Sequence, residues 1–166
     1  MDSEVNRRPL IAAGTALGIG MGGFVDGILF HQILQVHNML SAVRPPTSLV
    51  NVEINMFWDG LFHAFTWIMT AVGLALLWRA VKRPRCALST RTLVGSWILG
   101  WGLFNLVEGI IDHHIIGIHH VVEGPGHLPY DLAFLGSGVL FIALGALLVR
   151  GDPLGRPGSR ASPAAA

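Results

Sequence analysis

Four stretches of the chain are apolar over lengths that can cross a lipid bilayer. They run from about residues 10 to 34, 56 to 78, 92 to 118 and 128 to 149. A helix needs roughly 20 apolar residues to cross the hydrocarbon core, and each stretch is near or above that length. The pattern predicts an all-α, polytopic membrane four-helix bundle that occupies residues 1–150. The Gly-, Pro-, Ser- and Ala-rich segment 151–166 is predicted to be a disordered cytoplasmic tail.

The composition agrees with a membrane protein. Of 166 residues, 52% are hydrophobic and 13% are charged, well below the usual quarter for a soluble domain. The bilayer is therefore the expected partner, and a second copy of the chain or a membrane-complex subunit could join it. The few basic residues do not gather into one face, so no nucleic-acid partner is expected.

The basic residues indicate how the spans are oriented. Nearly all lie before the first span, between the second and third, or after the fourth, and Arg44 alone lies in the other two connections. The positive-inside rule then predicts that both termini and the middle connection are cytoplasmic. The segments around His37 and His119–His127 should face outward.

An internal repeat links the first and third spans. "VDGILFHQILQVH" at 25–37 aligns without a gap with "VEGIIDHHIIGIH" at 107–119. The alignment pairs Asp26 with Glu108, and it pairs two histidines of each copy at the same offsets. A weaker echo joins "WDGLF" at 58–62 to "YDLAF" at 130–134. These matches predict a duplicated two-helix hairpin.

Ionisable residues gather in the predicted outer half of all four spans. No Lys or Arg occurs within any span, so histidines, bound protons or a metal cation must balance the acids. Carboxylates and imidazoles without thiolate suit zinc, iron or manganese, and we favour iron or zinc over copper. The predicted metal ligands are Asp26, His31, Asp59, His63, Glu108, Asp112 and His113.

A second set of residues could serve as an outer shell or handle protons: His37, His114, His119, His120 and Asp131. His119 ranks lower because it would lie about 16 Å beyond Glu108 if the helix continued. On a straight α-helix, His31 would also point about 140° away from Asp26. Two metals, two shells of ligands or a bent helix could each resolve that mismatch.

Three classes of function stay open. A metal-binding membrane protein, with redox or hydrolytic chemistry, is the first, and haem held by His31 and His113 is its variant. A transporter or proton-relay component could use the same polar layer. In the third class, the layer only specifies helix packing in a structural or assembly subunit.

Several motifs resemble an uncharacterised family of bacterial membrane proteins with four spans, a domain of unknown function. They are "FVDGILFHQILQVHNMLS", "MFWDGLFHAFTWIMTAVGLALLWR" and "GWGLFNLVEGIIDHHIIGIHHV". The resemblance covers about residues 9 to 150. It implies a multi-pass protein of the bacterial inner membrane, and it implies no activity or cofactor.

Overall fold

The computed structural model describes residues 6–153, and most of these residues are helical. The predicted disordered tail lies outside this range from residue 154 onward. Four helices are long and apolar enough to cross a membrane, over Arg8–Ile33, Leu49–Val81, Thr90–Ile115 and Leu128–Arg150. The prediction of an all-α fold with four membrane-spanning helices is confirmed.

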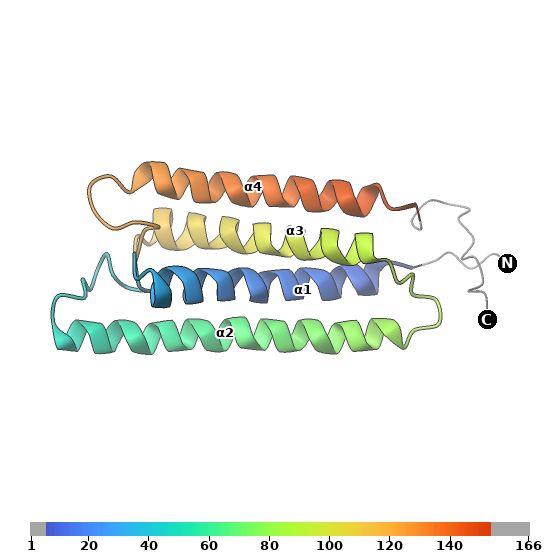
Figure 1. Cartoon of the computed structure of the whole chain (residues 1–166), viewed down its shortest axis with the longest axis horizontal. Helices are drawn as coiled ribbons and strands as arrows, with labels where there is room; N and C mark the ends of the chain where they lie inside the picture. Colours follow the sequence, from blue (N-terminus) through green and yellow to red (C-terminus); the bar gives the residue numbers. More distant parts are fainter. Residues whose placement is uncertain (1–5, 154–166) are drawn as a thin grey trace.

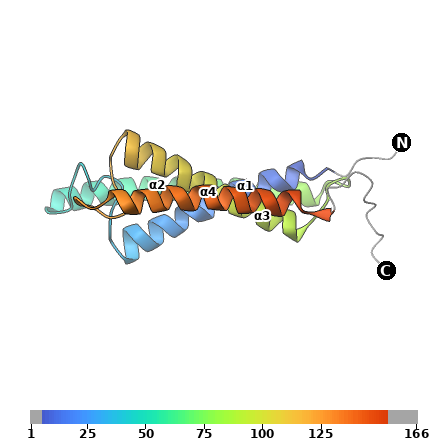
Figure 2. The ribbon, with the colours of Figure 1, turned by 90° about the horizontal axis from the view of Figure 1, so that it is seen from above.

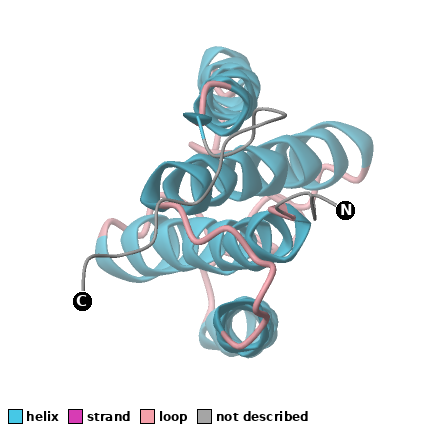
Figure 3. Cartoon of the chain, turned by 90° about the vertical axis from the view of Figure 1, so that its right-hand side faces the viewer, coloured by secondary structure: helices cyan, strands magenta, loops and turns pink. Residues whose placement is uncertain are grey.

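The helices lie in a row (Figure 1). α1 (Arg8–Val25) and α3 (Thr90–Glu108) form the central pair, α2 (Leu49–Val81) packs on α1, and α4 (Leu128–Arg150) packs on α3. Seen from above, the central pair crosses as an X (Figure 2), and the end-on view shows the four helices stacked one on another (Figure 3). The outer helices therefore present most of their apolar side chains to the surroundings, as a lipid environment allows.

The central pair is held together by close backbone contact. A Cβ atom placed on Gly18 would lie 2.0 Å from the carbonyl oxygen of Trp97, and one on Gly100 would lie 2.1 Å from that of Thr15. Any larger residue at either position would push the helices apart. Small residues at such crossings let membrane helices pack by van der Waals contact, where the hydrophobic effect gives little help.

Each central helix changes its winding toward the same end of the molecule. α1 continues as the π-helix η1 (Asp26–Ile33), and α3 continues as the π-helix η2 (Gly109–Ile115). The third span was expected to run to about residue 118, but it ends at Ile115 and the chain turns at Gly117, whose φ is +63°. The matching residue of the first copy, Gln35, has a φ of +51°.

The second span is longer than the apolar run alone indicated. It begins at Leu49 rather than near residue 56, because Ser48 caps it by accepting a hydrogen bond from the Asn51 amide. Ser89 caps α3 in the same way through the Thr92 amide.

Candidate metal centre

The two π-helices explain how Asp26 and His31 meet, although a straight α-helix would point them apart. A π-helix carries i→i+5 hydrogen bonds, so residues five apart come onto one face. The Leu34 amide accordingly donates to the Leu29 carbonyl, and the Ile116 amide donates to that of Ile111. As a result, Nε2 of His31 lies 3.1 Å from Oδ2 of Asp26.

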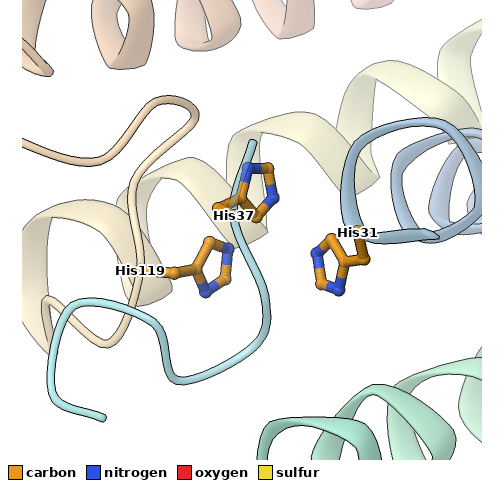
Figure 4. Close-up of side chains that lie close together, drawn as sticks. All are labelled: His31, His37 and His119. Atoms are coloured by element: carbon orange, nitrogen blue, oxygen red, sulfur yellow. The ribbon is translucent and has the colours of Figure 1, made fainter. Parts of the chain in front are cut away.

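Three imidazoles meet at this end of the molecule (Figure 4). His31 comes from η1, and His37 and His119 come from the connections that follow the two π-helices. All three are buried, and their ring nitrogens can be chosen so that every pair lies within 4.8 Å. The rings of His37 and His119 are stacked with centroids 5.0 Å apart. Histidines 82 residues apart in the chain thus line one small space.

Nδ1 of each of these three rings is already hydrogen-bonded to an acceptor. Nδ1 of His31 donates to Oδ1 of Asp59 at 2.9 Å, Nδ1 of His37 donates to the Val121 carbonyl at 2.9 Å, and Nδ1 of His119 donates to the Met39 carbonyl at 3.2 Å. A carboxylate or carbonyl can only accept, so each Nδ1 carries the proton.

The Nε2 atoms of the three rings behave differently from the Nδ1 atoms. Nε2 of His31, His37 and His119 is buried in every case and has no hydrogen-bond partner among the described residues. With Nδ1 protonated, a neutral imidazole at His37 or His119 presents its lone pair at Nε2, whereas Nε2 of His31 faces Oδ2 of Asp26 at 3.1 Å. Metal-binding histidines show this same arrangement, in which the far nitrogen donates to a carboxylate or carbonyl and thereby orients the ring.

The second copy of the repeat adds another group. Glu108, His113 and His119 also bring their ligand atoms within 4.8 Å of one another, and all three are buried. Oε1 of Glu108 lies 3.6 Å from Nε2 of His119, and neither carboxylate oxygen of Glu108 has a hydrogen-bond partner in the described part of the chain. His119 belongs to both groups and joins them into one cluster of four histidines and two acids, together with Asp26.

Contacts of the two halves recur at matching positions. Met39 and Val121 both donate their amides to a carboxylate of the flanking helix, Asp59 on α2 and Asp131 on α4. Those carboxylates also reach matching histidines, since Oδ1 of Asp131 lies 3.4 Å from Nδ1 of His113. His37 and His119 each bind the carbonyl two residues beyond the other, in the opposite half. The predicted duplication offers one simple reason for this pairing.

The surroundings of His119 favour its neutral form. Burial, with His37 and His113 beside it, lowers the pKa of His119 from 6.5 to about 3. The ring is therefore uncharged at neutral pH, which is the state that binds a metal.

The structure places the other predicted residues around the cluster. Asp59 orients His31 and joins none of the three-residue groups, whereas Asp131 contacts His113 and belongs to the third group described below. His63 binds the carbonyl of Asp59, one turn earlier on its own helix. Asp112 lines an apolar groove beside Glu108. His114 is exposed and binds the Gly109 carbonyl. His63, Asp112 and His114 thus lie outside the groups that could share one ion.

A third group lies nearer the surface. His120 and His127 stack with centroids 3.7 Å apart, and Nδ1 of each lies 2.8 Å from Oδ2 of Asp131. His127 was not among the predicted site residues. Its spacing of four residues before Asp131 was the available signal, because residues four apart share a helix face.

Comparison with known proteins identifies the family but no activity. The model of a family described as "Predicted membrane protein (DUF2243)" matches residues 13–152. The chain belongs to the DUF2243 family. Comparisons with curated proteins and with solved structures give no match. This DUF2243 protein is therefore an integral, multi-pass membrane protein, and any function must be argued from its buried cluster.

Proposed function

We propose that this DUF2243 protein is a membrane metalloprotein that binds one or two first-row transition-metal ions in the cluster. The observation that carries the proposal is the set of three buried imidazoles of His31, His37 and His119. One ring nitrogen of each lies within 4.8 Å of the others, and their Nε2 atoms have no hydrogen-bond partner among the described residues. Nε2 of His31 lies 3.1 Å from Oδ2 of Asp26, but the carboxylate oxygens nearest Nε2 of His37 and His119 are 3.9 Å and 3.6 Å away. Burying a polar nitrogen without a hydrogen bond has no benefit for folding alone, since each costs about 1–3 kcal/mol. A bound cation would use all three.

The charge balance supports the same proposal. Asp26 and Glu108 are both buried in the cluster, and the membrane spans around them contain no Lys or Arg near this end. Nε2 of His37 lies 3.9 Å from Oδ2 of Asp26, so this carboxylate lies near Nε2 of both His31 and His37. One divalent ion would offset both negative charges, whereas unpaired buried carboxylates would destabilise the fold.

The donor set favours iron or zinc over copper. Imidazole and carboxylate ligands suit iron, zinc and manganese, whereas copper(I) prefers thiolate or thioether ligands. Cys86 lies at the opposite end of the molecule, where it pairs with Asn6 in a short backbone bridge. Two groups that share His119 could hold two ions, as dinuclear enzymes do.

A non-haem centre fits better than haem. For haem, His31 and His113 would have to face each other across a porphyrin. The ring of His119 lies 5.9 Å from that of His31 and 4.7 Å from that of His113, so it occupies space beside both. This crowding favours direct metal binding, with a redox or hydrolytic reaction at the ion.

A proton-relay or transport role is the second candidate. Its support is a chain of close polar contacts from His127, whose side chain is about one-third exposed, through buried Asp131 to His113. Such acid–histidine chains mark proton and ion pathways in membranes. In that case the cluster would conduct protons without holding metal.

Elemental analysis tests the proposal. Protein purified in detergent without a His-tag should contain one or two equivalents of iron or zinc, and His37→Ala and His119→Ala should reduce the content at least tenfold. His114→Ala is the matched control and should keep it. Folded native protein without stoichiometric metal after growth with iron and zinc would overturn the proposal. A strong Soret band that is lost in His31→Ala would instead support haem.

A further inference from the structure

A groove opens beside the cluster toward the lipid-facing surface. It has a volume of about 580 Å³ and is lined by α1, α2 and α3. Trp58, Phe62, Phe65 and Phe104 contribute aromatic side chains to its walls. Trp58 and Phe65 are both exposed, so a molecule dissolved in the bilayer could enter from the side. The volume is typical of a site for a small molecule.

The groove ends at a buried acid, Glu108. Glu108 lines it and is only 4% exposed, and neither of its carboxylate oxygens has a hydrogen-bond partner in the described residues. Asp112, one turn further on, lines the same space. A ligand hydroxyl both donates and accepts, so it can form a hydrogen bond with the Glu108 carboxyl group in either protonation state.

The groove and the cluster share walls. Glu108 belongs to the group with His113 and His119, and Phe62 stacks on His31 with ring centroids 5.5 Å apart. Phe62 also contacts Phe104, with centroids 6.0 Å apart. A head group that reached Glu108 would therefore lie next to the proposed metal ligands.

We propose that the groove binds a membrane-soluble quinol, with its ring among the aromatic side chains and a hydroxyl directed at Glu108. Binding of the quinol does not require the metal, but a reaction of the bound quinol rests on the proposed metal centre. Three observations select the class. The entrance lies in the bilayer, the walls favour an aromatic ring, and the buried carboxyl group of Glu108 favours a hydroxyl. An acyl chain would account only for the entrance that lies in the bilayer.

Binding in nanodiscs tests the inference. Tritiated hydroquinone with a decyl tail should bind saturably at one equivalent per chain, after subtraction of empty nanodiscs. The same molecule with both hydroxyls methylated should bind at least tenfold more weakly, since it cannot donate. Asp112→Asn should weaken quinol binding severalfold without changing the metal content, because Asp112 lies outside the three-residue groups.

A filling variant and a matched control complete the test. Leu61→Trp adds bulk to the groove and should lower binding at least tenfold, whereas Leu140→Trp on the exposed face of α4 should leave it unchanged. Equal binding of the quinol and its dimethyl ether, or unsaturable binding, would overturn the inference and indicate an ordinary lipid groove.

Metal analysis of the same samples separates the two proposals. Metal without saturable quinol binding would contradict only the groove assignment. Saturable quinol binding without metal would support the groove and contradict only the metal centre.

Discussion

At the scale of single residues, hydrogen bonds to Nδ1 decide what the histidines can do. Nε2 of His31, His37 and His119 is left to face the cluster because Nδ1 of each ring is held by Asp59, Val121 or Met39. That Asp26 and His31 belong to one site could be proposed from the sequence, although their direct contact could not. The central position of His119 could not, because a straight helix would place it far beyond Glu108, whereas the chain turns back after Ile115.

The orienting role of Asp59 gives the first prediction. Its carboxylate binds His31 Nδ1 and also the Met39 amide at 2.8 Å, so it positions both η1 and the following connection. Asp59→Asn should weaken metal binding roughly 10–100-fold, the usual cost of losing an orienting partner. Competition with a chromophoric chelator measures this affinity.

Glu53→Gln is the control for that experiment, because Glu53 is an exposed acid on the same helix. It should bind metal as the native protein does. An unchanged affinity in Asp59→Asn would mean that His31 needs no partner for its orientation.

At the scale of elements, the π-helices and the close crossing of α1 and α3 build the site. Apolar periodicity indicated helices in both places but could not distinguish π from α winding. That difference decides whether Asp26 and His31 diverge or meet. The small residues of "GIGMGG" at 18–23 are of the kind that allows a close helix contact, and Gly18 lies in that contact.

The crossing gives the second prediction. Gly100→Ala would place a methyl group against the Thr15 backbone and should destabilise the protein by about 1–3 kcal/mol, as overpacking does. Thermal unfolding in detergent measures the loss. Gly136→Ala on α4 meets nothing within 4 Å, so this variant should unfold at or slightly above the native temperature. Equal unfolding temperatures for the two variants would contradict the tight crossing.

At the scale of the whole molecule, opposite ends have opposite character. Near one end the Arg7 guanidinium donates to the Val149 carbonyl at 2.7 Å, and Arg91 donates to Leu148. Asp152 joins α3 to the end of α4 there, accepting hydrogen bonds from Ser89 and Thr92. The histidines and buried acids occupy the other end. The charge pattern of the sequence could predict this segregation, because it depends only on the order of spans and loops.

The third prediction concerns orientation in the membrane. We expect the basic end to be cytoplasmic and the cluster to lie on the outer side of a bacterial inner membrane. In a Cys86→Ser background, cysteines placed at Ser48 and Gly124 should react with an impermeant thiol reagent on intact cells. One placed at Ser89 should react only after lysis. Labelling of position 89 with protection of position 124 would reverse the orientation.

X-ray absorption at the edge of the bound metal tests the central claim most directly. We predict two or more imidazole ligands with N/O neighbours at about 2.0–2.2 Å and no sulfur neighbour. In His119→Ala the imidazole contribution should fall together with the metal content. A bound metal whose spectrum contains sulfur or no imidazole, or one that is unchanged in His119→Ala, would contradict the assignment of the cluster as a metal centre.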